Sequence, residues 1–399
     1  MASTALDLAE FVLPPAPLRQ WVLTFPFAWR SRLGFDAKLL GALTRIFVQT
    51  VLGFYTKRMT REGVAAGQSG AVVVLQRLSS DLRLMPHLHV LFIDGVYEER
   101  REQVLFHELP HLSTREVGAN LEEAVRRMAR HLKRRGLLDA TANDTENLSP
   151  LDEGHAALCA SAASGQEPPA GPELRHKERP MAKVARAPLV FDKPLCATLD
   201  GFSLHAASRA GALDTKGREA LIRYVLRPPI AQERVTSGPD GLVRIVLKRE
   251  FSDGTIAVDL DPLSLLSRLA ASVPAPRMHM VRYAGVLGSA SKLRSRIVPN
   301  PKPVGSTGKD ASVEEEQEHR RGYRCWAKLL HASLGIDALI CPRCQGRMRV
   351  IALVREPSEI RRFLANLGEP TSPPRRAPAR GPPYWASRPM RVRAGDEAA

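Results

Sequence analysis

Apolar residues recur along the chain with periods that predict a mixture of short strands and longer helices. A first set of strand-like runs lies at 20–25, 70–77 and 87–93. Because only a polar stretch separates the last two, they are predicted to be neighbouring strands. Helical spacing begins near Ala37 and again near 115, and the second helix is expected to end at Gly136, a common helix terminator.

The same mixture continues in the second half of the chain. Order is expected to return at 199–205, followed by a helix over 216–226 that Pro228 stops. Two alternating runs around Ser252-Asp253-Gly254 predict a hairpin over 242–260. Asp261 then introduces another helix. No internal repeat is evident.

Composition shifts mark three segments that lack such patterns. Residues 140–185 are rich in Ala, Ser, Gly, Pro and charge and are expected to form a flexible, exposed insertion. Residues 299–318 have the composition of a polar linker, and 370–399 that of a disordered basic tail.

The charge balance points to a polyanionic partner. The 399 residues include 58 Lys and Arg against 42 Asp and Glu, a net charge of +16. Such an excess favours binding to nucleic acid, because each phosphate that the protein neutralises releases counterions. The five cysteines are too scattered for a disulfide framework, and the N-terminus lacks the pattern of a secretory signal. With apolar runs of strand length only, we expect a cytoplasmic protein without a membrane anchor.

The motif His87-Leu88-His89 is the first candidate for chemistry. Side chains alternate along a strand, so both histidines project from one face and Leu88 from the other. Two such imidazoles can supply two ligands to one divalent ion, although an isolated pair of this kind more often only forms hydrogen bonds.

Several co-ordered segments resemble the rolling-circle insertion-sequence transposases of the HUH class. They are GAVVVLQRLSSDLRLMPHLHVLFIDGVYEE at 70–99, LRQWVLTFP at 18–26, GFSLHA at 201–206, LIRYVLRPPIA at 221–231 and PRMHMVRYAGVL at 276–287. The resemblance spans about residues 17–355. It implies an α+β fold, an antiparallel sheet with helices on one side, formed by a metal-binding part at 17–139 and a tyrosine-bearing part at 186–298.

The resemblance also implies roles for individual residues. His87 and His89 would bind Mg²⁺ or Mn²⁺, and Tyr224 would be the nucleophile that forms a 5′-phosphotyrosine with DNA. Arg223 and Arg227 flank this tyrosine and suit phosphate contacts. The third metal ligand stays open between two residues, with Gln76 preferred and His205 as the alternative.

A second metal site is suggested near the C-terminus. Cys341-Pro342-Arg343-Cys344 has the form of half a zinc knuckle, and family members carry a similar segment. A four-ligand Zn²⁺ site would need Cys325 with His319 or His331, or a second chain. This small Cys-x-x-Cys module is expected over 319–369.

The chain departs from the family pattern in three respects. Relatives usually begin with a cysteine-rich zinc-binding region, and this chain has no cysteine before Cys159, so we expect that region to be lacking. Some relatives carry two tyrosines four residues apart, whereas Ala220 leaves Tyr224 alone, as in the single-tyrosine subgroup of this two-tyrosine family. Ala284 stands directly before the Gly285-Val286 pair, where relatives often have a histidine.

The expected function is that of a transposase that nicks and joins single-stranded DNA at the ends of a mobile element and at its target. The alternatives are a plasmid replication initiator or relaxase with the same chemistry, and an inactive DNA-binding relic. A bacterial protein associated with the nucleoid is expected. The sequence leaves the oligomeric state open.

Overall fold

The structure, a computed structural model, describes residues 7–101, 103–138, 187–228, 230–251, 253–274, 278–298, 343–349, 356–371 and 387–391, with shorter pieces at 5, 155–156, 158–160, 162–163, 337, 339–341 and 354. The chain forms two compact units, Ser3–Pro301 with Tyr384–Ala399, and Lys302–Pro383. In the second unit the structure describes helix α11 (Pro357–Leu367). Every other element named below belongs to the first unit.

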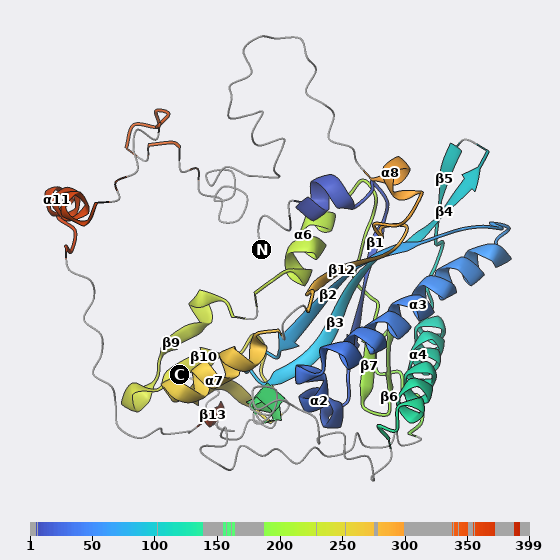
Figure 1. Cartoon of the computed structure of the whole chain (residues 1–399), viewed down its shortest axis with the longest axis horizontal. Coiled ribbons are helices and arrows are strands. Elements are labelled where there is room, and N and C mark those ends of the chain that lie inside the picture. The colour runs from blue at the N-terminus through green and yellow to red at the C-terminus, as the bar shows by residue number, and fades with distance from the viewer. Residues whose placement is uncertain are drawn as a thin grey trace, which may run out of the picture. The chain divides into compact units, whose positions relative to one another are not determined.

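A seven-stranded antiparallel sheet forms the centre of the first unit. Its strands are β1 (Leu18–Thr24), β2 (Gly70–Leu78), β3 (Leu84–Ile93), β6 (Cys196–Leu199), β7 (Phe202–His205), β8 (Arg209–Ala210) and β12 (Val281–Gly285). They follow the order β12–β2–β3–β1–β7–β6, and β8 pairs with β1. The predicted pairing of 70–77 with 87–93 is confirmed, and segments distant in sequence lie side by side in one sheet (Figure 1).

One face of this sheet packs under three helices, α2 (Arg30–Phe35), α3 (Ala37–Arg61) and α4 (Thr114–Arg134). The core there joins Trp21, Leu88 and Phe92 of the sheet to Phe47 of α3 and Leu121 of α4, all fully buried. Helix α4 begins at a capping box formed by Ser113 and Glu116. It ends shortly before Gly136, whose φ is +68°, as the glycine pattern predicts.

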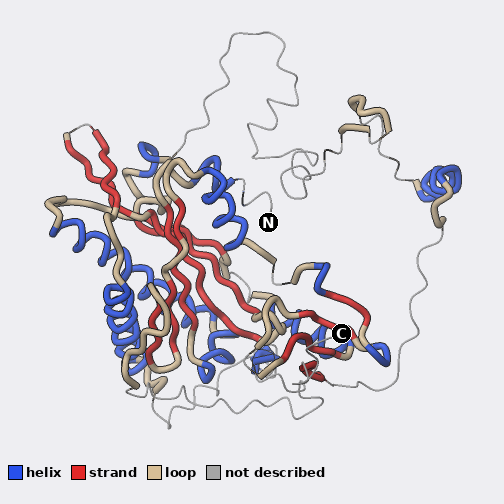
Figure 2. The backbone as a smooth tube through the Cα atoms, turned by 180° about the vertical axis from the view of Figure 1, so that it is seen from behind, coloured by secondary structure: helices blue, strands red, loops and turns tan. Residues whose placement is uncertain are grey.

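The opposite face of the sheet is also covered by helices, so the expectation of helices on one side only is wrong. Helix α6 (Thr215–Val225), the short η1 (Leu8–Val12) and α8 (Arg294–Ile297) pack there. The physical reason is that β2 and β3 carry apolar residues on both faces over part of their length. Val74 and Leu91 must be shielded from water on this face, and Ile222 and Val225 of α6 pack in the same buried cluster. Figure 2 shows the strands between helices.

A second antiparallel sheet has four strands in the order β13–β11–β10–β9: β9 (Val235–Ser237), β10 (Val243–Val246), β11 (Thr255–Leu260) and β13 (Ser387–Arg391). The predicted hairpin over 242–260 is confirmed by the pairing of β10 with β11. The tail at 370–399 was expected to be disordered, and β13 contradicts this for 387–391. Pairing with the edge of β11 uses main-chain groups, so it needs no apolar pattern in the tail.

Two further elements complete the first unit. Strands β4 (Gly95–Arg100) and β5 (Gln103–Glu108) form a two-stranded ribbon that projects from the large sheet (Figure 1). Helix α7 (Pro262–Ser272) follows β11, and the Asp261 side chain caps it by accepting hydrogen bonds from the N–H groups of Leu263 and Ser264.

The segment 140–185 was expected to be a flexible, exposed insertion, and its described residues contradict this in part. Residues 158–160 and 162–163 are helical, and Cys159 is fully buried in a small cluster with Leu84 and Ala271. Helical spacing of small apolar residues allows this contact although the segment's overall composition is polar. The linker at 299–318 lies outside the described residues, as do most of 140–185 and of 370–399.

Helix α3 is the one helix in the described part of the chain that is long and apolar enough to cross a membrane. Half of its most apolar stretch is buried inside the protein, as in the core helix of a globular fold.

Candidate active site

The strand register places the two histidines in one row with side chains of the neighbouring strands. His87 lies opposite Gln76 of β2 and Thr24 of β1, and His89 lies opposite Val74 and Val22. Directly opposed residues project from the same face of a sheet. The ring centroids of His87 and His89 are 5.0 Å apart. The sheet therefore holds both imidazoles on the face that α6 covers, away from the core under α3.

The protonation of His87 follows from its partner. Its Nδ1 lies 2.6 Å from the carbonyl oxygen of Met85, and a carbonyl oxygen can only accept, so Nδ1 donates and keeps the proton. Burial lowers the pKa of His87, and nearby Arg30 adds to this effect. The ring is consequently neutral at pH 7, with the lone pair on Nε2 free to bind a metal.

His89 is also neutral and is held by an amide. Burial, His87 and Lys248 lower the pKa of His89 to about 3. Its Nδ1 lies 2.6 Å from Nε2 of Gln20, which can donate to it. Rotation of the amide by 180° turns the Gln20 oxygen to this nitrogen, and Nδ1 then donates, which frees Nε2 for a metal.

Tyr224 is brought to the histidines by helix α6. Asp214 caps this helix by accepting a hydrogen bond from Gly217, and the buried Ile222 and Val225 fix it on the sheet. The Tyr224 ring stays half exposed, with its centroid 5.7 Å from that of His89. The structure thus places the sequence-predicted tyrosine and histidines together.

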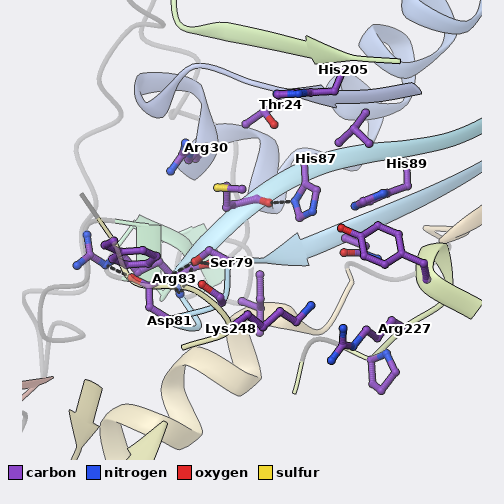
Figure 3. Close-up of a pocket in the computed structure, with 18 of the residues that line it drawn as sticks. Thr24, Arg30, Ser79, Asp81, Arg83, His87, His89, His205, Arg227 and Lys248 are labelled. Carbon is purple, nitrogen blue, oxygen red and sulfur yellow. Dashed lines mark hydrogen bonds and ion pairs between the residues drawn. The ribbon is translucent and has the colours of Figure 1, made fainter. Parts of the chain in front are cut away.

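Two cavities open on this face of the sheet and share His89, Tyr224, His205 and Val22. The larger has a volume of about 730 Å³ and extends along α6, and the other, of about 530 Å³, extends over His87 towards β10. Cations dominate the charged lining of the smaller one (Figure 3): Arg30, Arg83, Arg227, Arg234 and Lys248, against Asp81 alone. Such a lining suits a phosphate backbone.

The remaining predicted residues have separate positions. Gln76 lies beside His87, and its Nε2 donates to the Val225 carbonyl oxygen over 2.9 Å, which ties β2 to the tyrosine helix. Arg227 lines the smaller cavity, whereas Arg223 lines neither cavity and pairs with Glu219 at 3.6 Å. His205 lines both cavities, but its strand β7 is separated from β3 by β1.

His205 has a close partner of its own. Its Nδ1 lies 2.8 Å from Sγ of Cys196, the residue opposite it on β6. Burial lowers the pKa of His205 and raises that of the Cys196 thiol, so both groups are neutral at pH 7.

Sequence reasoning missed Gln20, Arg30, Arg234 and Lys248. Gln20 lies within the family-like segment at 18–26, and its alternation with Trp21 and Val22 could have assigned it to the histidine face. No local signal marks the other three, because isolated cations are common along the sequences of soluble proteins. They reach the site through contacts distant in sequence, as when Arg234 donates to the carbonyl oxygens of Ser80 and Val246.

The described residues contain no group of three His, Cys, Asp or Glu side chains placed to hold a metal ion. A site built on His87 and His89 therefore needs a ligand of another type. Gln76 fits, because its nitrogen is engaged with Val225 and its Oε1 makes no hydrogen bond within the described part of the chain. Two neutral imidazoles and one amide oxygen form a donor set that divalent ions such as Mn²⁺ accept.

In the second unit, Cys341 and Cys344 lie in a tight turn. The Cys341 carbonyl oxygen accepts from Gln345 N–H, and its N–H donates to the Gly346 carbonyl oxygen, each over 2.9 Å. Backbone N–H groups of Cys344 and Arg343 directed at the sulfur lower the pKa of Cys341, which favours the thiolate that zinc binds. Cys325, His319 and His331 lie outside the described residues.

A family model described as "Putative transposase" matches residues 70–294, more than half of the chain. The match contains His87, His89 and Tyr224, and it ends before the C-terminal cysteines. No curated protein and no solved structure matches the chain.

Proposed function

Because the chain belongs to this transposase family, we propose that it nicks and joins single-stranded DNA through a covalent bond between Tyr224 and a 5′ phosphate. The single observation that carries the proposal is the position of Tyr224, whose ring lies 5.7 Å from that of His89, on a cation-lined cavity. A tyrosine on a basic cleft beside two neutral imidazoles has the parts that phosphodiester transfer requires.

The chemistry needs only an exchange of phosphate esters. The Tyr224 Oη forms a bond to phosphorus, the bond from phosphorus to the 3′ oxygen breaks, and the proton lost by the phenol is balanced by one gained at the 3′ oxygen. A second 3′-OH can reverse these events and join a new strand. The energy of the phosphodiester is conserved in the phosphotyrosine, so no nucleotide cofactor is needed.

His87, His89 and Gln76 would hold a divalent ion, which when bound neutralises phosphate charge and orients the phosphodiester. The protein prepares this site in advance. Met85 orients His87, Gln20 orients His89, and Val225 orients Gln76 through hydrogen bonds of 2.6, 2.6 and 2.9 Å. Since Val225 follows Tyr224, Gln76 also links the ligand row to the nucleophile.

We propose a single strand as the substrate of this cleft. Tyr224 lines both cavities, so a strand laid across them would present one phosphate to the tyrosine. The exposed ring of Tyr224 and the basic lining offer contacts to bases and phosphates of an unpaired strand.

The test uses the purified chain, Mn²⁺ and labelled single strands from the DNA that flanks the gene on each side. We expect a covalent protein–DNA adduct that withstands denaturation, and its loss in Tyr224→Phe. Tyr283→Phe is the matched control, because Tyr283 is also partly exposed but lines neither cavity. An adduct of equal yield in Tyr224→Phe would exclude this nucleophile, and no adduct in the wild type would indicate an inactive DNA-binding relic.

The same assay tests the metal ligands. EDTA and His87→Ala should each reduce adduct formation by about a hundredfold or more. Retention of wild-type activity by His87→Ala would remove this residue from the ligand set.

For Cys341 and Cys344 we propose Zn²⁺, completed by Cys325 and a histidine or by a second chain. Support comes from the turn that directs backbone N–H groups at Cys341.

A further inference from the structure

Lys248 faces the metal-ligand row from the other side of the smaller cavity. It follows β10, in the four-stranded sheet, and shares the cavity lining with His87, His89 and Tyr224. Its Nζ lies 6.0 Å from the centroid of the Tyr224 ring. In Figure 3 the Lys248 side chain lies across the cavity from His87 and His89.

The cations around this point lack compensating negative charge. Asp81, the one carboxylate of the lining, pairs with Arg83 at 2.9 Å. Within the described residues Lys248 has no carboxylate partner, and burial together with Arg227 and Arg234 lowers its pKa. Clustered cations repel one another, so the arrangement is most stable when an anion lies among them.

Lys248, unlike the neighbouring Arg234, is available to bind that anion. Arg234 donates its Nε and Nη2 to main-chain carbonyl oxygens of Val246 and Ser80, over 2.6 and 2.8 Å, and so anchors the four-stranded sheet to the loop after β2. The Lys248 side chain makes no such bond in the described part of the chain. Its ammonium group keeps three donors for a ligand.

We propose that Lys248 binds a non-bridging oxygen of the phosphodiester that Tyr224 attacks, and so clamps this phosphate against the histidine row. The inference rests on the proposed function and adds a catalytic residue to it. As the bond from Tyr224 to phosphorus forms and the bond to the 3′ oxygen breaks, negative charge concentrates on the phosphate oxygens. A fixed ammonium beside these oxygens stabilises the transition state more than it stabilises the bound strand before reaction. Lys248 keeps its protons throughout.

The test compares Lys248→Met, Lys248→Arg and Lys216→Met. Methionine retains most of the side-chain length without the charge, and arginine restores the charge. Lys216 is an exposed lysine on the tyrosine helix that lines neither cavity, so its variant controls for the loss of one positive charge. The measurements are the single-turnover rate of adduct formation at saturating protein and the dissociation constant by anisotropy, with Mn²⁺ and the same flanking single strands.

We expect Lys248→Met to reduce the adduct rate by about a hundredfold to a thousandfold, the usual effect of removing one donor to a developing charge, with less than about a tenfold change in binding. Lys248→Arg should recover most of the rate, and Lys216→Met should match the wild type. A structural role would not be rescued by arginine and would not separate the rate from binding.

The outcomes distinguish this inference from the function on which it rests. A wild-type adduct that forms equally fast in Lys248→Met overturns the role of Lys248 and leaves the proposed function standing. The same role is overturned if Lys248→Arg is as slow as Lys248→Met. If the wild-type chain forms no adduct, the proposed function fails and the role of Lys248 fails with it.

Discussion

At the scale of single residues, buried polar groups keep definite orientations because each has a hydrogen-bond partner. A buried polar group without a partner costs free energy, so His87 stays with the Met85 carbonyl oxygen and Gln76 with that of Val225. The reactive atoms are thereby oriented before any ligand arrives. A short distance, such as that between the His89 and Tyr224 rings, can serve catalysis only when the side chains are held in this way.

The buried thiol of Cys159 gives a prediction at this scale. Burial raises its pKa to about 11, from an ordinary value of 9.0, although Arg77 opposes the shift. The unfolded chain therefore releases this proton at lower pH than the folded chain does. The stability that the neutral thiol contributes is fully present below pH 9.0 and is lost as the pH rises towards about 11.

We expect the free energy of unfolding of the wild type to fall more steeply between pH 8 and pH 11 than that of Cys159→Ala, by up to about 2–3 kcal/mol over the window. Urea unfolding at several pH values measures it. Parallel curves for the two proteins would show that Cys159 is not buried as described.

At the scale of elements, the Asp94 carboxylate joins strands β1, β3 and β8 to helix α3. Asp94 follows β3 and is fully buried, and it accepts from Arg19 of β1 over 2.9 and 3.0 Å, from Arg209 of β8 over 2.7 Å and from the Tyr55 hydroxyl of α3 over 2.9 Å. These bonds secure β1 against β3. Since Gln20 and His89 project from these two strands, the same bonds support the candidate site.

Asp94→Asn should lower the free energy of unfolding by about 3–5 kcal/mol, because it leaves the buried guanidinium of Arg19 without a counter-charge. Glu123→Gln is the control. Its partner Arg126 is 54% exposed, so the loss of that ion pair should cost less than about 1 kcal/mol. Chemical denaturation of both variants measures the difference, and similar stabilities would contradict the structural role of Asp94.

At the scale of the whole first unit, positive charge is not confined to the face that carries Tyr224. Helix α4 lies on the other face of the sheet and presents Arg130, Lys133 and Arg134 to solvent. None of the three has an ion-pair partner among the described residues. Cations so placed cannot contact the phosphate at Tyr224, but they attract the rest of a long strand.

The triple change Arg130→Ser, Lys133→Ser and Arg134→Ser should weaken binding of long single strands and make the salt dependence of the binding constant shallower, by up to about 2 in the logarithmic slope. The adduct rate on a short, saturating oligonucleotide should not change. If the slope of the salt dependence does not change, the non-specific affinity comes from the cleft or from other cations.

The elements with a clear local pattern could be predicted from the sequence. The period-two alternation of His87-Leu88-His89 sets which side chains share a face, and the capped helices α3, α4 and α6 follow from their apolar spacing and their terminal residues. Two predictions from composition were wrong in part, because Cys159 is buried and 387–391 form β13. Composition averages over a segment, whereas burial and strand pairing depend on a few positions.

The sequence by itself therefore determined the local elements and the face that carries the histidine pair, and its charge excess favours a polyanionic partner. Only the tertiary structure decided which distant residues meet. Gln20 reaches His89, Gln76 reaches Val225, and Lys248 reaches Tyr224 across separations set by sheet order, register and the packing of α6. No short-range period encodes such contacts, because they arise from burying apolar surface on both faces of one sheet.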